Sequence, residues 1–210
     1  MNYKYRIQYT KESSARWLGH LEVTDIIRRA CRASRMPLKY SEGFHPLPRV
    51  SMGDALSVGM ESGVEFFDVE LTAEMQCDTI LKGLKKFLPS GLSPVEVSIL
   101  NGKVNSIQES IACSTYEVSL PNSNHEELSA AVDRFNDSKE MIVDITRGKR
   151  ALKLNLVSYV VKLAVVRSCV IELALRSLRP GLKVAEFVQH GLKVTDENIM
   201  IMKTKVEWRS

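Results

Sequence analysis

The chain has 210 residues, of which 44% are hydrophobic and 26% charged, and its formal net charge is +4. These values are typical of a globular chain that forms one large domain or two small ones. No apolar run approaches the ~20 residues that cross a bilayer, and residues 1–6 lack the apolar segment of a signal peptide. We therefore expect a cytoplasmic protein without a membrane partner.

The first half of the chain predicts alternating strands and helices. Residues 3–9 alternate between apolar and polar side chains, as in a strand with one buried face. A helix follows, and Pro37 closes it because the residue before a proline is pushed out of the α region. Its apolar stripe consists of Val23, Ile26, Ile27, Ala30 and Ala33. We expect further strands at 49–52, 65–72 and 92–100 and a second helix at 78–88.

The second half repeats this order approximately. We expect strands at 115–120, 141–145, 159–166, 169–175 and 199–208, and helices at 125–135 and 184–192. Strands 159–166 and 169–175 should form a hairpin. Each half then approximates β-α-β-β-α-β, so the prediction is an α+β chain of two tandem ferredoxin-like units. The polar segment 101–106 is the expected linker, which gives domains at 1–105 and 106–210.

Charge is divided unevenly along the chain. Residues 1–53 contain ten Lys/Arg and four Asp/Glu, a local net of +6, whereas residues 54–100 contain three and eight, a local net of −5. A basic helix that leads into a basic Gly/Pro-containing loop is a plausible anion-binding face, and a polynucleotide is the obvious anion.

The first helix carries four arginines within residues 28–35. At ~100° per residue, Arg28, Arg32 and Arg35 fall opposite the apolar stripe, and Asp25 shares their face. One interpretation is a solvated face with ordinary Asp–Arg pairs. The other is a phosphate-binding face, because arginine suits planar, bidentate phosphate contacts.

The loop 41–49 is the second candidate element. It offers Ser41, Gly43, His45 and Arg49 as contacts, and its backbone N–H groups could cradle a phosphate. The alternative is a tight connection without a ligand. Phe44 could stack on an unpaired base together with His45, or it could plug the core.

A second basic cluster has four Lys/Arg within residues 147–153 and no acid. We expect Arg147, Lys149 and Arg150 to lie in a loop between strands. A mobile solvated loop and a nucleic-acid contact are both consistent with this pattern.

His20 lies at the expected start of the first helix. The positive end of the helix dipole disfavours protonation there, so a neutral imidazole could act as a general base. A single histidine without a visible partner is more often structural or a cap.

Metal and cofactor chemistry has little support in the sequence. Cys31, Cys77, Cys113 and Cys169 are far apart and form no Cys-x-x-Cys pair, so we expect four buried free thiols and no bound metal. The sequence contains no phosphate-binding loop of the form Gly-x-x-x-x-Gly-Lys-Ser/Thr. It also lacks the hydrolase motif Gly-x-Ser-x-Gly and the zinc motif His-Glu-x-x-His, and we expect no cofactor.

A series of motifs in the first half resembles the "radical SAM-linked" family of uncharacterised bacterial proteins, the DUF2344 group. The matching segments are His20-Leu21-Glu22, 28–33, Met36-Pro37, 41–46, 49–51 and 56–59. Members of this family occur fused to, or encoded beside, a radical-SAM protein, often near genes for RNA processing. The resemblance implies a radical-SAM partner, although the chain itself lacks the cluster-binding cysteine triplet. The expected architecture is also similar, at the level of the fold alone, to RAMP-type RNA endonucleases.

Together these patterns favour an accessory module that binds RNA and presents it to a radical-SAM enzyme. On this hypothesis the chain is not an enzyme on its own. The alternatives are a metal-independent ribonuclease that uses His20 as its base, and a protein-interaction module that does not bind RNA.

Overall fold

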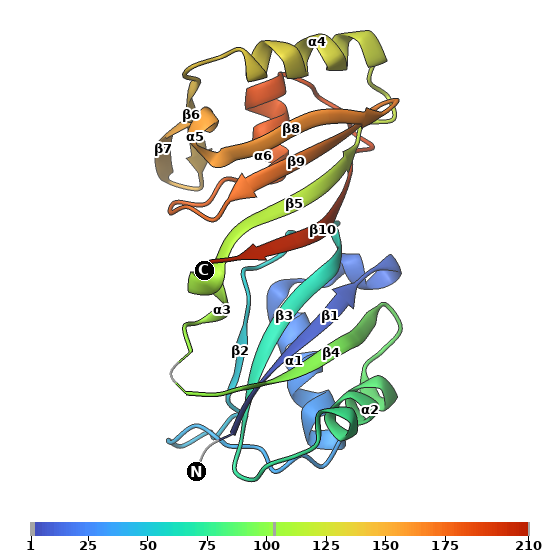
Figure 1. Ribbon diagram of the computed structural model, residues 1–210, viewed down its shortest axis with the longest axis vertical. Coiled ribbons are helices and arrows are strands. Elements are labelled where there is room, and N and C mark those ends of the chain that lie inside the picture. Colours follow the sequence, from blue (N-terminus) through green and yellow to red (C-terminus); the bar gives the residue numbers. More distant parts are fainter. Residues whose placement is uncertain (1–2, 103, 210) are drawn as a thin grey trace. The chain divides into compact units, whose positions relative to one another are not determined.

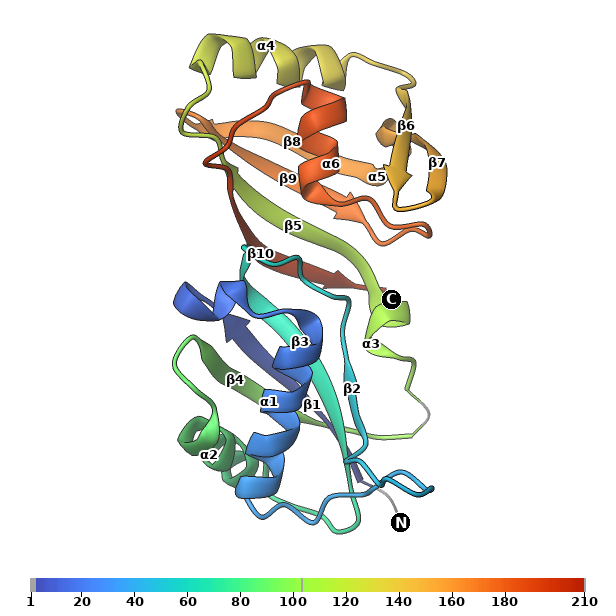
Figure 2. The same cartoon turned by 180° about the vertical axis from the view of Figure 1, so that it is seen from behind.

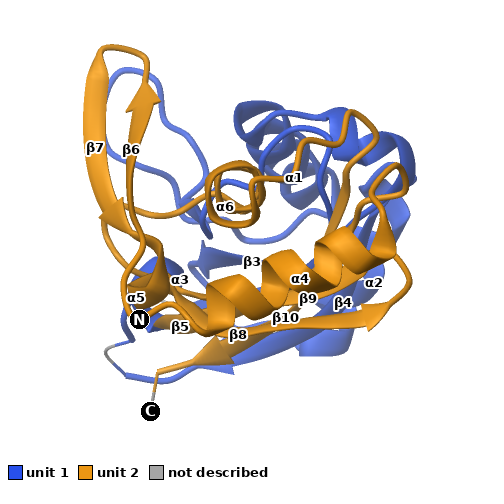
Figure 3. Ribbon diagram, turned by 90° about the horizontal axis from the view of Figure 1, so that it is seen from above, with its two compact units in different colours: residues 1–110 blue, residues 111–210 orange. Residues whose placement is uncertain are grey.

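The chain is an α+β protein in the computed structural model, which describes residues 3–102 and 104–209 (Figure 1). It divides into two compact units, Met1–Ser110 and Ile111–Ser210, which are coloured separately in Figure 3. Lys103, within the expected linker, lies outside the described residues. Among the described residues, no helix is long and apolar enough to span a bilayer.

In unit 1, four strands are paired in antiparallel fashion in the order β4-β1-β3-β2. Its elements are, in chain order, β1 (Tyr3–Lys11), the 3-10 helix η1 (Ser13–Trp17), α1 (His20–Ala33), β2 (Val50–Met52), β3 (Glu61–Leu71), α2 (Cys77–Phe87), β4 (Leu92–Leu100) and α3 (Ile107–Ser110). Helices α1 and α2 lie over the same face of this sheet (Figures 1 and 2). The strands and helices expected at 49–52, 65–72, 78–88 and 92–100 are confirmed, with shifts of up to four residues at their ends.

The core of unit 1 forms between this sheet face and the two helices. Tyr5, Ile7 and Tyr9 of β1 are buried at alternate positions, as the period-two pattern predicts. They pair with Val69, Phe67 and Glu65 of β3, respectively, so side chains of the two strands share the helix-covered face. Ile27 and Ala30 of α1 and Ile80 and Leu84 of α2 complete this core.

Helix α1 begins at His20, as predicted. Gly19 is its N-cap, and the Glu22 carboxylate accepts a hydrogen bond from the Gly19 N–H at 2.7 Å. The helix ends at Ala33, and Arg35 then adopts a left-handed φ of 53°. The helix therefore ends before Pro37 is reached, so Pro37 is not the residue that closes it. Ala33, expected in the apolar stripe, is exposed, and the neighbouring Ser34 packs against Gly83 of α2 instead.

In unit 2, four strands are paired in antiparallel fashion in the order β10-β5-β9-β8. Its elements are β5 (Ile111–Ser119), α4 (His125–Asn136), β6 (Ile142–Arg147), β7 (Arg150–Asn155), α5 (Leu156–Tyr159), β8 (Val160–Arg167), β9 (Val170–Arg176), α6 (Val184–Phe187), the π-helical turn η2 (Val188–Leu192) and β10 (Met200–Trp208). The expected hairpin of 159–166 with 169–175 is confirmed as β8–β9.

One strand of unit 2 pairs differently from the expected β-α-β-β-α-β order. The strand expected at 141–145 is β6, and it pairs with β7 in a separate two-stranded ribbon. Ile145 and Leu154 are buried, so this ribbon has its own apolar contacts. In the chain order, this ribbon lies between α4 and the β8–β9 hairpin.

Strands β4 and β8, each at one edge of the strand order in its unit, have irregular registers. On β4, the pairing with β1 shifts beside Pro94, where Gln8 pairs with Glu96 but Tyr9 pairs with Pro94. On β8, the register shifts twice, between Val160 and Lys162 and between Val165 and Arg167. Such bulges bend a strand and interrupt its hydrogen-bond ladder.

Candidate nucleic-acid interface

The outer face of α1 carries the arginines that the sequence predicts. Arg29, Arg32 and Arg35 are exposed, and none of them forms an ion pair within the described residues. Arg28 has 24% of its side chain exposed, and its Nη1 lies 3.6 Å from Oδ1 of Asp25. Its Nε is buried and has no hydrogen-bond partner in the described part of the chain, which is an unfavourable state for a donor. Arg29 was absent from the predicted contacts, although its helical position also lies opposite the core.

A groove of about 500 Å³ lies on this face. Its lining combines basic, acidic and apolar side chains, namely Leu18, Glu22, Asp25, Ile26, Arg28, Arg29, Arg32 and Leu47. We call it the arginine groove. Its volume falls within the ~300–1,000 Å³ typical of ligand pockets. Leu47 belongs to the loop after α1, so the groove brings that loop and the helix together.

The loop between α1 and β2 is closed at its base. The Ser41 N–H donates to the Leu47 carbonyl at 2.8 Å, and the Leu47 N–H donates to Ser41 Oγ at 3.0 Å. Gly43, at the tip, has a φ of 132°. Phe44 and His45 are exposed, so Phe44 does not plug the core.

Many other cations of the first half are paired inside unit 1. The ion pairs join Lys4 and Arg6 to Asp68, Lys39 and Arg49 to Glu70, and Arg16 to Glu61, at 2.8 to 3.9 Å. Strand β3 supplies all three acids. The acidic excess of residues 54–100 therefore neutralises part of the basic excess of residues 1–53. Arg49, a predicted contact, shares its carboxylate with Lys39 and keeps 41% of its side chain exposed.

The second basic cluster lies around the turn of the β6–β7 ribbon. Lys149 is in the turn, as expected, whereas Arg147 ends β6 and Arg150 begins β7. Arg147 donates to Glu186 through Nε, at 2.7 Å, and to the Gly181 carbonyl through Nη2, at 2.7 Å. Burial raises the pKa of Glu186, but the hydrogen bonds from Arg147 and from the Lys183 N–H outweigh this and hold it below its usual value. Arg147 therefore ties the ribbon to the segment around α6.

Arg147→Ala should destabilise unit 2, since it leaves the Glu186 carboxylate half-buried without its main partner. We expect a loss of about 1–3 kcal/mol in the free energy of unfolding, measured by urea denaturation. Lys149→Ala removes an exposed charge from the same turn and should change this free energy by less than about 0.5 kcal/mol. Equal effects of the two substitutions would show that the Arg147–Glu186 pair contributes nothing.

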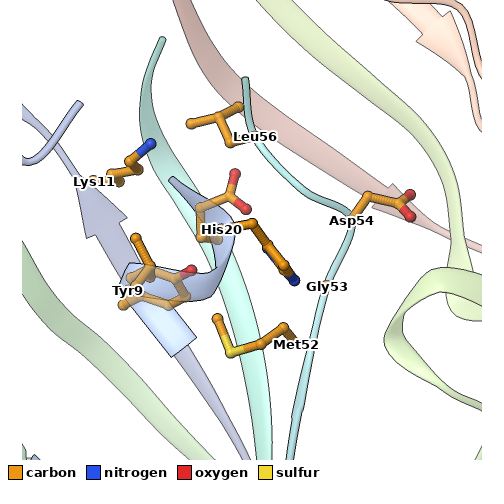
Figure 4. A pocket seen from close by; sticks show the side chains of 9 residues that line it. Tyr9, Lys11, His20, Met52, Gly53, Asp54 and Leu56 are labelled. Atoms are coloured by element: carbon orange, nitrogen blue, oxygen red, sulfur yellow. The ribbon is translucent and has the colours of Figure 1, made fainter. Parts of the chain in front are cut away.

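His20 lines a small polar pocket beneath the first turn of α1 (Figure 4). The other lining residues are Tyr9, Lys11, Val23, Met52, Gly53, Asp54, Leu56 and Glu65. The pocket holds about 10 Å³, which is close to the ~10–15 Å³ that one water molecule needs. A nucleotide does not fit into this space.

The pocket contains a buried lysine that the sequence analysis did not identify. Lys11 is 2% exposed, and its Nζ donates to the Arg16 carbonyl at 3.3 Å. Burial lowers the pKa of Lys11, against the opposing effect of the nearby Glu65 and Glu22 carboxylates. Burial also raises the pKa of Tyr9, and the charge of Glu65 raises it further.

Lys11→Met should alter how stability depends on pH. Because the folded-state pKa of Lys11 is lowered, the folded chain binds fewer protons than the unfolded chain between that pKa and 10.5. The Lys11 contribution to the free energy of unfolding therefore rises with pH through this window, and the variant should lack this rise. Urea denaturation at several values between about pH 7 and pH 10 measures the difference.

The control for this experiment is Lys82→Met, which removes an exposed lysine of α2. It should leave the pH dependence of the parent chain nearly unchanged. If Lys11→Met gives the same curve as this control, the burial of Lys11 has no effect on its protonation.

The four cysteines are free, as expected, but only two of them are buried. Cys31 and Cys113 are buried, whereas Cys77 and Cys169 are half-buried. Burial raises the pKa of Cys31 to about 12, so its thiolate is scarce at neutral pH. The described residues contain no group of three or more His, Cys, Asp or Glu side chains placed to hold a metal ion.

These features define an α+β protein with two units and an arginine-lined groove on the first. The chain belongs to a family described as uncharacterized proteins conserved in bacteria (DUF2344), whose model matches residues 4–186. A comparison with curated proteins finds no match. A solved structure of an unknown protein from Galdieria sulphuraria is similar over 100% of both chains, at 12% identity and a TM-score of 0.29, which does not establish a shared fold.

Proposed function

We propose that this chain is an accessory RNA-binding module that presents its substrate to a radical-SAM partner enzyme. The observation that supports RNA binding is the arginine groove, where Arg29 and Arg32 form no ion pair within the described residues. Guanidinium groups are well suited to planar, bidentate contacts with phosphate oxygens. The radical-SAM partner rests on the family resemblance alone.

The spacing of the groove arginines is compatible with an extended ligand. Arg28 and Arg32 are one helical turn apart, a rise of about 6 Å along the axis. Arg29 lies between them in sequence and faces the same groove. An RNA strand that lies along α1 would meet successive arginines. If the Arg28 side chain turned toward the groove, a phosphate oxygen could accept a hydrogen bond from its unsatisfied Nε.

The remaining predicted contacts have secondary roles in this proposal. Arg35, Gly43 and His45 are exposed next to α1 or in the following loop, and Lys149 and Arg150 are exposed on unit 2. Ser41 and Arg147 already make hydrogen bonds that hold local structure. We therefore leave Ser41 and Arg147 out of the contacts tested first.

We also propose that both units are ferredoxin-like. Unit 1 has the chain order β-α-β-β-α-β and a fully antiparallel sheet, β4-β1-β3-β2. Unit 2 has the same arrangement, β10-β5-β9-β8, once the β6–β7 ribbon is set aside. This architecture does not imply RNA binding, because the same fold serves many functions.

A protein-interaction module is the second candidate, and exposed apolar side chains favour it. Trp17, Leu21 and Val58 have 61%, 79% and 58% of their surface exposed. A ribonuclease that uses His20 has less support, because His20 faces a pocket the size of one water molecule.

Direct titration with RNA tests the proposal. The purified chain should bind labelled single-stranded or hairpin RNA, and the affinity should fall as the salt concentration rises. Fluorescence anisotropy of the labelled RNA measures this affinity. If the RNA affinity did not depend on salt concentration, or if no RNA binding were detected, the RNA proposal would be wrong and the protein-interaction candidate would be left. Cleavage of the same RNA in chelator by the parent, but not by His20→Ala, would favour the ribonuclease instead.

A further inference from the structure

The loop 41–47 is closed at its base by hydrogen bonds and carries an exposed aromatic ring at its tip. Two hydrogen bonds join Ser41 to Leu47, so the intervening residues form a compact loop and not an open tether. The ring of Phe44 is fully exposed at its tip. Phe44 makes no ring contact within the described residues, so packing inside this chain does not account for it.

Gly43 orients this tip. Its φ of 132° is a conformation that side-chain-bearing residues rarely adopt, and a Cβ built there would meet no atom within 4 Å. The glycine is therefore needed for the backbone conformation and not for close packing. The result is a chain direction that projects Phe44 and His45 into solvent.

The exposed ring lies near the groove arginines. Leu47 lines the arginine groove and also closes the loop. Phe44 is three residues from Leu47, so their Cα atoms are at most about 11 Å apart. A flat apolar surface thus stands within a few nucleotides of Arg28, Arg29 and Arg32.

We infer that Phe44 stacks on an unpaired base of the RNA whose phosphates occupy the arginine groove. This inference rests on the proposed function and narrows the substrate to single-stranded or looped RNA. In a duplex the faces of the bases are covered by their neighbours, whereas an unpaired base can stack on an aromatic ring. Arg29 and Arg32, which form no ion pair within the described residues, favour a polyanion beside the ring over an uncharged apolar partner.

A double-mutant cycle tests this contact. Phe44→Ala should weaken binding of single-stranded RNA by about 5- to 150-fold, the usual range for loss of one base–aromatic stack. An RNA series with one abasic nucleotide at each position should contain a member that loses the same factor with the parent chain. Phe44→Ala should then have little further effect on that RNA, because the two changes remove one interaction.

Matched variants separate stacking from general apolar contact. Phe44→Trp keeps a flat ring and should retain affinity, whereas Phe44→Leu keeps apolar volume and should behave like Phe44→Ala. None of these variants should change the unfolding midpoint, since the ring is fully exposed. Duplex RNA should bind the parent and Phe44→Ala equally.

The outcomes distinguish this inference from the function on which it rests. Unchanged RNA affinity in Phe44→Ala, while removal of the groove arginines weakens binding, would overturn the stacking contact and leave RNA binding intact. Equal RNA affinity of Phe44→Leu and the parent would also overturn it, in favour of a general apolar contact with the RNA. No RNA affinity in the parent would overturn both.

Discussion

Replacing Arg29 and Arg32 together with alanine is expected to weaken RNA binding about tenfold at physiological salt. Both side chains line the arginine groove and are exposed, so their loss should not disturb the core. Each arginine that neutralises a phosphate releases about one counterion. The slope of log K against log salt should therefore flatten by about 1–2 units, which anisotropy titrations at several salt concentrations measure.

The control for this variant is Lys82→Ala combined with Lys85→Ala. These lysines are exposed on α2, and their removal changes the net charge of the chain by the same amount. They should leave both the affinity and the slope nearly unchanged. Similar losses in the two double variants would mean that RNA responds to net charge alone and that the groove is not its site.

Alanine at Gly91 is expected to reduce the free energy of unfolding by about 2–5 kcal/mol, the sum of backbone strain and overpacking. Gly91 has a φ of 86°, and its added Cβ would lie 2.5 Å from the Glu12 carbonyl oxygen and 2.9 Å from Ala15 Cβ. The backbone cannot easily yield, because the Glu12 N–H donates to the Gly91 carbonyl at 2.8 Å. Urea or thermal denaturation measures the loss.

Gly102→Ala isolates the backbone-strain part of this effect, and the difference between the two variants gives the steric part. Gly102 has a similar φ of 73°, but a Cβ there would meet no atom within 4 Å. It should cost only the strain of a left-handed residue, about 1–2 kcal/mol. If Gly91→Ala costs no more than Gly102→Ala, the close approach of η1 to the start of β4 does not constrain this position.

The elements of unit 1 could be predicted because their signals are local. The alternation in β1 and the apolar spacing in α1 each depend on neighbours within one strand or helix. The β6–β7 ribbon could not be separated from the main sheet in this way. A short strand shows which of its faces is buried, but its partner is decided by contacts between distant residues.

Local sequence patterns also predict only part of the candidate site, because they do not specify contacts between distant residues. The angle of Arg32 on α1 follows from helical geometry, and its exposure agrees with it. The ion pairs of Asp68 and Glu70 depend on how β1 and the segments around Lys39 and Arg49 pair with β3, which no local pattern specifies. The charge asymmetry of the sequence therefore overstated the number of cations that a ligand can use.

The alternating pattern of β1 indicates that Lys11 is buried. Lys11 continues the buried phase of β1 after Tyr9, and Glu65 continues the buried phase of β3 before Phe67. A charged residue in the inward phase of a strand predicts either a strand end or a buried polar site. Here it marks both, because β1 ends at Lys11 beside the small pocket.

The irregular outer strands have a consequence for self-association. A regular outer strand presents unpaired N–H and C=O groups that can recruit a strand of another molecule and begin aggregation. Pro94 lacks an N–H and stands at the register shift of β4, while β8 has two register shifts and carries Lys162 and Arg167. Neither strand offers a continuous ladder to an incoming chain. The registers of β4 and β8 thus discourage edge-to-edge polymerisation through these two strands when the protein is concentrated.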